Sequence, residues 1–432
     1  MTVNTPAQDR AEETWQEIRK QVALERVEIL VGLPSFNNAE TVKGVIDAVV
    51  TGLQTTFSSA SVLLLNEDGG SQDGTPELVK AAVEDRVPIA FVTRARSAAA
   101  GIEGFPPLSH AWVSGRAEAF HSFLTVTTQA GAAACAVIDP AMRGVTPDWM
   151  KWLLGPIVES RADYVAPLFL RPRYEGTLTN TLVYPLNRAL YGAAMRYHTG
   201  GGCGISGGLA ATLLQRDFWK ERAAHSSIES CFTTVAVAER RPLCQAGLGE
   251  KLMQGPPSGE DVSTVVAQTV DLVFYFMERY QDVWEHPSVA RPVLEVGLPG
   301  GLLPDHGAIN VDRMIRGFRL GLRDLLPLWE IILSPETLSG ILPLGVVDKE
   351  DFVFPPSLWA QTVYDFALAY HEKVLHRDHL LKSLTPLYLG QIASLVLRTQ
   401  SRKPEQVEEC IEELCDTFAR MRPYLVERWR FS

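Results

Sequence analysis

Two apolar runs near the start of the chain each end in a polar loop and lead into an amphipathic helix. Residues 27–33 form the first run, which Pro34 closes before the chain turns through Asn37. Residues 61–65 form the second run, which ends in Asp68 and a loop rich in glycine, serine and aspartate. Repetition of strand, polar loop and helix in this order predicts a doubly wound α/β domain.

The same pattern continues to about residue 255 and then becomes helical. Further strands are predicted at residues 88–93, 133–138 and 163–169, a helix at 115–130 and a long loop at 93–115. Beyond residue 260, apolar positions recur at three- and four-residue spacing, as in amphipathic helices. Irregular connectors are predicted at residues 287–305 and 341–356.

Three regions follow from this pattern. Residues 1–26 are charged and helical in pattern, residues 27–255 form the α/β body, and residues 256–432 form a helical region. The stretch QGPPSGE at residues 254–260 marks the second boundary, because glycine and proline interrupt both helices and strands.

The polar ends of the first strands are the predicted ligand site. Ligands of open α/β sheets bind outside the carboxyl ends of the strands. A carboxylate such as Asp68 suits a ribose or a base donor group better than it suits a phosphate. No G-x-G-x-x-G string follows the first strand, which argues against a dehydrogenase and favours another nucleotide-binding enzyme.

Composition excludes several classes of protein. A formal charge of −11 disfavours a nucleic-acid partner, because phosphate binding needs concentrated lysine and arginine. No apolar run approaches the roughly 20 residues that span a bilayer, and the amino terminus lacks a secretory pattern. Six scattered cysteines without a CxxC pair predict reduced, mostly buried thiols and a cytoplasmic protein.

Eight strings between residues 27 and 255 carry a family resemblance. In chain order they are VGLPSFNNAETV, LLNEDGGSQDGT, VIDPAMRGVTPDWM, RPRYEGTLTN, YPLNRALYG, HTGGGCGIS, SSIESCFTTVAVAE and LGEKLM. Together they resemble GT-A-fold, family-2-like retaining glycosyltransferases that make glucosylglycerate and mannosylglycerate. The resemblance implies an α/β fold of the GT-A type, Rossmann-like with a mostly parallel sheet flanked by helices, followed by a helical carboxy-terminal region.

The resemblance also implies roles for particular residues. Binding of a nucleotide-diphosphate sugar falls to Pro34, Asn37, Glu40, Asp68, Asp139, Gly200 and Gly201. Binding of a small acidic acceptor, such as glycerate or phosphoglycerate, falls to Arg171, Arg173, Tyr174, Thr177 and Asn180. The catalytic positions are Glu229, near the transferred hexose, and Arg116 and Lys251, which face the diphosphate. Arginine suits a carboxylate or phosphate acceptor because its planar fork donates two parallel hydrogen bonds.

The metal site implied by the family is incomplete. The family binds Mg²⁺ or Mn²⁺ through the last Asp of an Asp-x-Asp element and a His, which are Ala141 and Met253 in this chain. Asp139 alone remains, whereas these ions require several hard oxygen or imidazole ligands. The acidic residue that follows the double glycine in the family is also absent, since Gly202 and Cys203 stand there.

Two alternatives follow from the missing ligands. In one, fixed cations such as Arg116, Arg143 and Lys251 neutralise the diphosphate in a metal-independent enzyme. In the other, the chain is a pseudo-glycosyltransferase that acts as a nucleotide-sugar-binding or scaffold subunit. The helical carboxy-terminal region either forms a homodimer interface or closes over the acceptor.

Overall fold

The chain divides into two compact units that interleave in sequence. The structure is a computed structural model, and it describes residues 15–22, 24, 26–93, 111–197, 200–221, 227–253, 261–286, 291, 293–304 and 309–431, with only the backbone at 111–115. Unit 1 comprises Met1–Leu170, Tyr197–Pro256 and Val293–Gly300, and unit 2 comprises Arg171–Arg196, Pro257–Pro292 and Gly301–Ser432. The boundaries at 26/27 and 255/256 stay predictions.

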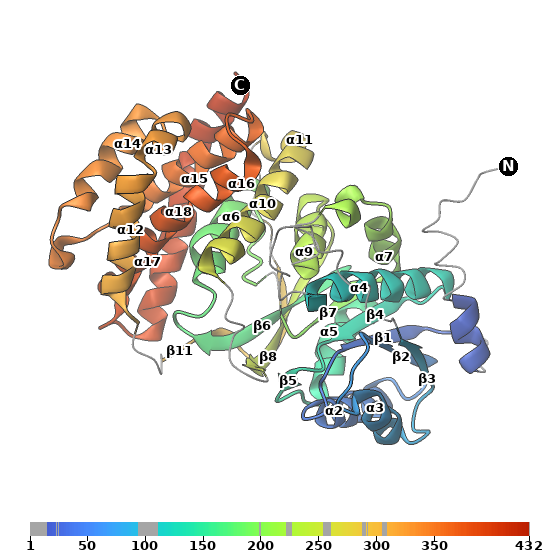
Figure 1. Cartoon of the computed structure of the whole chain (residues 1–432). Helices are drawn as coiled ribbons and strands as arrows, with labels where there is room; N and C mark the ends of the chain where they lie inside the picture. The colour runs from blue at the N-terminus through green and yellow to red at the C-terminus, as the bar shows by residue number, and fades with distance from the viewer. Residues whose placement is uncertain are drawn as a thin grey trace. The chain divides into compact units, whose positions relative to one another are not determined.

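A mostly parallel sheet is the centre of unit 1 (Figure 1). Its strands are β1 (Ile29–Ser35), β2 (Val62–Asp68), β3 (Ile89–Thr93), β4 (Ala134–Ile138), β6 (Tyr164–Pro172), β7 (Gly202–Ser206), β8 (Leu243–Glu250) and β10 (Leu294–Gly297). Their spatial order is β10-β8-β6-β7-β4-β1-β2-β3. All run in one direction except β7, which is antiparallel to both β4 and β6. The predicted α/β fold with a mostly parallel sheet is confirmed.

Helices cover both faces of this sheet. One face carries α2 (Val42–Thr56), α3 (Thr75–Val83) and α5 (Asp148–Val158), and the other carries α4 (Ala111–Gln129), α7 (Gly207–Leu214) and α9 (Ile228–Ala238). A 3₁₀ turn lies at Asp217–Lys220, and residues 15–21 are helical. Every residue of β1 and β2 is buried, which explains why the two strands read as continuous apolar runs rather than alternating ones.

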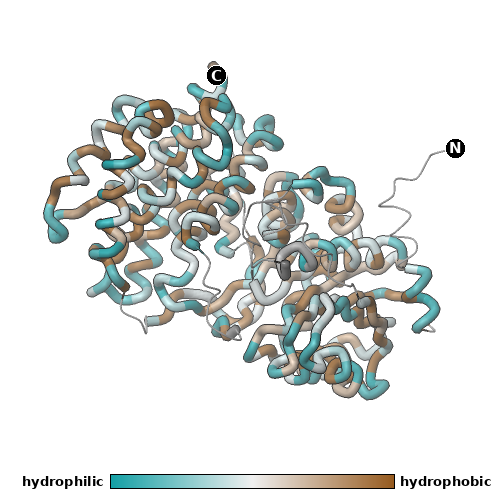
Figure 2. Tube along the Cα trace, in the orientation of Figure 1, coloured by the Kyte–Doolittle hydropathy of each residue, from teal (hydrophilic) through white to brown (hydrophobic). Residues whose placement is uncertain are grey.

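Unit 2 is almost entirely helical. Its helices are α6 (Tyr184–Tyr191), α10 (Val262–Arg279), α11 (Gln281–Trp284), α12 (Val311–Asp324), α13 (Leu326–Ile332), α14 (Pro335–Ile341), α15 (Pro356–His371), α16 (Arg377–Ser383), α17 (Thr385–Thr399) and α18 (Pro404–Trp429). Thr179–Val183 forms a π-helix, Leu342–Gly345 and Lys349–Asp351 form 3₁₀ turns, and Gly301–Leu303 forms β11. Figure 2 shows polar and apolar positions alternating along these helices, as their amphipathic pattern predicts. The predicted helical carboxy-terminal region is confirmed.

Two predictions about local structure are wrong, and one strand was not predicted. The connector predicted at residues 287–305 contains β10, a short edge strand with only alternate residues half-buried, and β11. The loop predicted at 93–115 ends earlier, because α4 begins at Ala111, while residues 94–110 lie outside the described part. The glycine turn at 200–202 leads directly into β7, which apolar patterning did not indicate because two of its five residues are glycine.

One helical stretch has the length and apolar composition of a membrane span. It runs from Arg377 to Thr399, and 78% of its most apolar window is buried inside the protein. The core helix of a folded domain has the same properties, and α16 and α17 divide this stretch at Leu384.

Candidate functional site

The direction of the chain across the sheet reverses between β1 and β4. From β1 the chain proceeds to β2 and β3 on one side, and it returns to β4 on the other. Doubly wound sheets bind ligands beside such a reversal, at the loops that follow the two strands. Contacts between the two segments include a 2.6 Å hydrogen bond that Thr41 Oγ1 donates to the carbonyl oxygen of Pro140.

Asp68 organises the polar loop that follows β2. Its carboxylate is 2% exposed and accepts four hydrogen bonds, from Ser35 Oγ (2.9 Å), Ser71 Oγ (2.6 Å) and the backbone N–H groups of Gly70 (2.9 Å) and Ser71 (2.7 Å). All of its principal acceptor positions are thus used inside the protein. The predicted contact of Asp68 with a nucleotide requires a ligand to replace one of these donors.

The loop after β1 is bonded to the loop after β2. Asn37 adopts a left-handed conformation with φ 51°; its N–H donates to Ser71 Oγ (2.9 Å), and its side-chain oxygen accepts from the N–H of Gln72 (3.0 Å). Asn is one of the few residues that tolerate this conformation. Predicted donor-binding residues at Pro34, Asn37 and Asp68 are therefore brought together at one end of the sheet.

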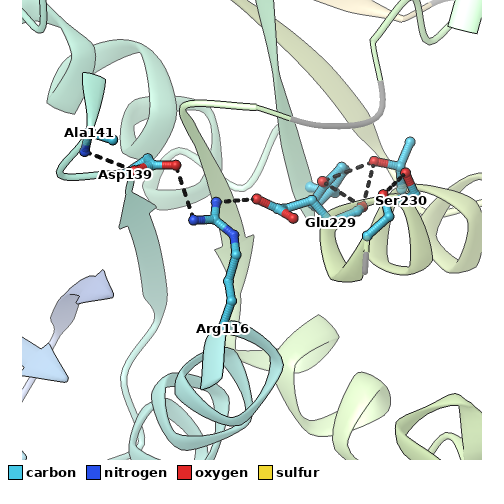
Figure 3. Close-up of polar contacts among 8 residues, drawn as sticks. Arg116, Asp139, Ala141, Glu229 and Ser230 are labelled. Atoms are coloured by element: carbon cyan, nitrogen blue, oxygen red, sulfur yellow. Dashed lines mark hydrogen bonds and ion pairs between the residues drawn. The ribbon is translucent and has the colours of Figure 1, made fainter. Parts of the chain in front are cut away.

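A buried ionic bridge lies at the end of β4 (Figure 3). Arg116, from α4, donates one hydrogen bond to Asp139 Oδ2 (3.0 Å) and another to Glu229 Oε1 (2.5 Å). The three side chains are 13%, 5% and 10% exposed, respectively. Burial disfavours the charged guanidinium, but the charges of Glu229 and Asp139 outweigh it and raise the pKa of Arg116. One cation and two carboxylates give the bridge a formal charge of −1.

Backbone groups fix the Asp139 end of the bridge. Asp139 Oδ1 accepts a hydrogen bond from the N–H of Ala141 (2.9 Å), and the N–H of Asp139 donates to the carbonyl oxygen of Gly201 (3.0 Å). Gly201 has φ 73°, and a Cβ atom there would lie 2.7 Å from Cζ of Phe169. Only glycine fits this position, so the glycine turn before β7 has a structural reason as well as the predicted ligand role.

Two buried hydroxyl groups fix the Glu229 end. Glu229 lies in the first turn of α9, and its carbonyl oxygen accepts hydrogen bonds from Thr233 Oγ1 (3.0 Å) and from the hydroxyl of Tyr164 (3.5 Å). Thr233 and Tyr164 also lie 3.0 Å apart. The sequence did not single out Thr233 or Tyr164. Thr233 lies one helical turn after the candidate Glu229, and Tyr164 lies in the strand predicted at residues 163–169; these places are their only sequence signal.

The cysteine beside the glycines is buried and unreactive. Cys203 is 1% exposed, and burial, followed by the charge of Glu229, raises the pKa of its thiol. All six cysteines are free and buried, as predicted.

Ala141 and Met253, which stand where the resembled glycosyltransferases have metal ligands, are brought together. Met142–Arg143 forms β5, Leu252–Met253 forms β9, and these two-residue strands pair with Met142 opposite Met253. The chain thus places Ala141 and Met253 near each other, but neither offers an oxygen or imidazole ligand. Among the described residues, no cluster of three His, Cys, Asp or Glu side chains could hold a metal ion. The residues of this site do not fit Mg²⁺ or Mn²⁺.

The two other predicted cations differ from Arg116 in their surroundings. Arg143 forms a 3.1 Å ion pair with Glu40, and the two side chains are 54% and 69% exposed. Lys251 directly follows β8; its N–H donates to the carbonyl oxygen of Leu170 (3.1 Å) and its side chain is half-buried. Of the three, Arg116 alone contacts Asp139 and Glu229 in the described structure.

The predicted acceptor residues lie at the start of unit 2. Arg173 donates to the carbonyl oxygens of Thr399 (3.3 Å) and Arg402 (2.8 Å), at the carboxyl end of α17. Tyr174 bonds to Thr399 Oγ1 (2.9 Å). A guanidinium in this place satisfies terminal carbonyl groups and the negative end of the helix dipole. Arg173 therefore has a structural role that the sequence did not indicate.

The other acceptor candidates are also within unit 2. Thr177 Oγ1 bonds to the hydroxyl of Tyr388 (2.6 Å), and Arg171 is 4% exposed. Asn180 is 1% exposed in the π-helix, and its side-chain oxygen has no hydrogen-bond partner among the described residues. Single π-helical turns are frequent at functional sites, and most buried polar groups in proteins are hydrogen-bonded.

A hollow of about 470 Å³ lies at the opposite edge of the unit 1 sheet. It is lined where β4 and β6 begin and β7 ends. Its polar groups already bond one another, since Ser206 Oγ donates to Asp163 Oδ1 (2.6 Å) and caps α7 by accepting from the N–H of Leu209 (3.1 Å). The hollow is therefore separate from the bridge and from the loops after β1 and β2.

Comparison with known proteins gives structural neighbours only. No family model and no curated protein matches the chain. Among solved structures, the chain is similar to glucosyl-3-phosphoglycerate synthase from Mycobacterium tuberculosis in complex with phosphoglyceric acid, at 18% identity, 63% coverage of this chain, 84% of that chain and a TM-score of 0.40. The same enzyme in complex with Mn²⁺, uridine diphosphate and glucosyl-3-phosphoglycerate is 19% identical, with 65% of this chain and 87% of that chain covered and a TM-score of 0.40. A mycobacterial protein is 19% identical, with 63% of this chain and 78% of that chain covered and a TM-score of 0.40.

Proposed function

We propose that this protein is a hexosyltransferase that binds a nucleotide-diphosphate sugar at the carboxyl ends of β1 and β4 in unit 1. The observation that carries the proposal is the convergence of the two bonded polar loops and the Arg116 bridge at the carboxyl edge of the sheet. Hydroxyl-rich and amide-rich loops suit the base and ribose of a nucleotide, and fixed carboxylates suit sugar hydroxyl groups.

The proposed role of Arg116 is to oppose the charge of the leaving diphosphate. Because the bridge carries a formal charge of −1, an incoming diphosphate meets repulsion unless the guanidinium exchanges one carboxylate for a phosphate oxygen. Such an exchange keeps Arg116 paired throughout and places its charge where negative charge develops in the transition state. Arg143 and Lys251 are the further cations proposed to assist.

The transfer itself needs no strong protein base if the product retains the configuration of the donor. The bond between the anomeric carbon and the diphosphate oxygen breaks, and the acceptor hydroxyl oxygen bonds to that carbon from the same face. The hydroxyl proton passes to the departing diphosphate. Glu229 then needs only to hold the hexose hydroxyl groups through its carboxylate.

The proposed acceptor is a small carboxylate or phosphate compound such as glycerate or phosphoglycerate. Two arginines are proposed to bind it: Arg171, which is buried, and Arg173, which would have to release the end of α17 to do so. Asn180 is a further candidate, since its buried side-chain oxygen can accept a hydrogen bond from a hydroxyl group.

A second function is a nucleotide-sugar-binding or scaffold subunit without activity. The observation in its favour is that Arg116 is held by two carboxylates and that the metal ligands are replaced by Ala141 and Met253. A transfer assay separates the two functions. Purified protein is incubated with UDP-, GDP- and ADP-hexoses and with glycerate or 3-phosphoglycerate, with and without Mn²⁺.

A hexosyl product with retained anomeric configuration supports the enzyme. Replacement of Arg116 by Ala should then lower the rate by roughly 10²-fold or more while nucleotide binding is still detectable. Nucleotide binding without product for any donor and acceptor supports the scaffold.

A further inference from the structure

Two buried amide side chains in unit 2 lack a hydrogen-bond donor for their oxygen. Gln391 of α17 is 4% exposed, and its Oε1 has no hydrogen-bond partner among the described residues. Asn180 of the π-helix is 1% exposed, and its Oδ1 has none there either. Most buried polar groups in proteins are hydrogen-bonded, so two unsatisfied amides within one unit need an explanation.

The two amides flank one hydrogen bond between their segments. Thr177 Oγ1 and the hydroxyl of Tyr388 lie 2.6 Å apart and join the start of the π-helix to α17. Asn180 follows Thr177 by three residues, and Gln391 follows Tyr388 by three. Each amide therefore lies within about one helical turn of this bond.

Gln391 also shares a face of α17 with Arg398, which lies seven residues, or about two turns, further along. Arg398 reaches Glu413 of α18 (3.5 Å), and the π-helix contacts α18 as well. Gln391 thus faces the part of unit 2 where α17, α18 and the π-helix meet.

The segment before the π-helix brings one buried cation to this place. Arg171 is 4% exposed, and a Cβ atom at Gly176 would lie 3.5 Å from its Nη1, so the guanidinium lies against the turn before Thr177. Arg173 donates to the carbonyl oxygens at the end of α17. While Arg173 caps α17, Arg171 is the arginine of this segment that can meet an acidic group.

We propose that Gln391 and Asn180 bind hydroxyl groups of the acceptor, and that the acceptor is a hydroxy acid without a phosphate group. The inference rests on the transfer proposed above and names the class of acceptor. An amide both donates and accepts hydrogen bonds, as a hydroxyl group does, whereas a phosphate dianion only accepts them.

The charge of the acceptor leads to the same class. A single carboxylate is matched by the guanidinium of Arg171, which can donate two parallel hydrogen bonds to it. A phosphate monoester adds a charge of about −1.5 to −2 at pH 7, which needs a second cation that Arg173 does not supply while it caps α17. Gln391 makes α17 a part of the acceptor site, so the helical carboxy-terminal region helps to select the acceptor.

An amide kept for a ligand differs from a structural one in its effect on stability. Methionine resembles glutamine in length and lacks the amide, so Q391M removes an unsatisfied buried group and should leave the free energy of unfolding unchanged or raise it. Ser394 of α17 is the matched control, because it is 1% exposed and its Oγ accepts from the N–H of Phe354 (2.9 Å). S394A should lower the free energy of unfolding, since it leaves that N–H unpaired.

Titration calorimetry with the full chain tests the proposal. Binding of glycerate and of 3-phosphoglycerate is measured for the wild type, Q391M, N180L and S394A, alone and with UDP, GDP or ADP. The wild type should bind glycerate at least ~10-fold more tightly than 3-phosphoglycerate, because the phosphate stays unpaired. Q391M and N180L should each weaken glycerate binding by about 10-fold, and S394A should leave it unchanged. Urea unfolding of the same variants gives their stability.

Tighter binding of 3-phosphoglycerate, or no binding of glycerate at millimolar concentration, would overturn the proposal. So would a Q391M variant that binds glycerate as the wild type does, or that loses stability as S394A does, because the amide would then hold an ordered water or the fold. Binding is measured without transfer, so the two proposals fail separately. Glycerate binding that depends on Gln391 in a protein that transfers no hexose overturns the proposed function alone, and transfer to glycerate that Q391M leaves unchanged overturns this inference alone.

Discussion

Replacement of Arg116 by methionine should destabilise unit 1 far more than loss of an ordinary ion pair does. Methionine keeps most of the apolar stem and removes the charge. It leaves Asp139 and Glu229, which are 5% and 10% exposed, without the cation that both contact. Removing one partner of a buried ion pair costs about 3–5 kcal/mol, because the remaining charge stays buried and unpaired. That is a large fraction of the roughly 5–15 kcal/mol that stabilises a typical domain.

A matched control exists on the same sheet edge. Arg143 also pairs with a carboxylate, at 3.1 Å, but the two side chains are 54% and 69% exposed. Exposed pairs of this kind contribute about 0–1 kcal/mol, because water screens them. Replacement of Arg143 by methionine should therefore be nearly neutral. Replacement of Arg116 by lysine should fall between, since an ammonium group cannot bridge two carboxylates as a guanidinium fork does.

Hydrogen exchange followed by mass spectrometry is the suitable assay. A chain with two compact units need not unfold in one step, so a single melting temperature can conceal a change confined to unit 1. Amide protection in β4 reports the free energy of opening of the sheet itself. If R116M lowers that free energy no more than R143M does, the bridge does not hold the site together and the electrostatic reasoning fails.

Three further substitutions test other parts of the account. Gly201→Ala should lower the free energy of unfolding by about 2–4 kcal/mol, because φ is 73° and the new Cβ lies 2.7 Å from Phe169. Gly131→Ala, where φ is 66° and no atom is close, should lower it by about 1 kcal/mol. Equal effects of the two substitutions in urea unfolding would contradict crowding at Gly201. Asp68→Ala should destabilise the loops by about 3 kcal/mol and weaken nucleotide binding by about 1–3 kcal/mol. Asp68→Asn should destabilise the loops by only about 1 kcal/mol, because an amide replaces part of the four hydrogen bonds. Identical results for the two variants in unfolding and calorimetry would refute this role of the carboxylate. Arg173→Met should lower the stability of unit 2 by about 1–2 kcal/mol, because the carboxyl end of α17 loses its cap. If amide protection in α17 is unchanged and acceptor binding is lost, Arg173 instead has the acceptor-binding role.

The sequence predicted those features that local patterns determine. β1, β2 and β4 are short apolar runs that end in polar residues, so their positions and the site edge that they form follow from neighbours in the chain. β10 was missed because a half-buried edge strand of four residues carries little apolar signal. β7 was missed because its glycines let the chain pass close to neighbouring backbone, and glycine ordinarily indicates a turn.

The site was predictable as a set of residues and not as an arrangement. Arg116, Asp139 and Glu229 were each expected near the donor, but their pairing depends on α4, β4 and α9 meeting across up to 113 positions of sequence. The cap that Arg173 forms on α17 joins residues more than 220 positions apart, and no local pattern indicates such a contact. Long-range partners decide whether an arginine binds a ligand or holds the fold.

We propose that unit 1 binds a nucleotide-diphosphate sugar without a divalent metal ion. Titration calorimetry of the full chain with UDP-, GDP- and ADP-hexoses, first with EDTA and then with Mn²⁺, tests it most directly. We expect saturable binding of one donor class with an affinity that is nearly the same in both buffers, because Ala141 and Met253 supply no metal ligand. Absence of binding to every donor at millimolar concentration, or binding that EDTA abolishes and Mn²⁺ restores, would contradict it.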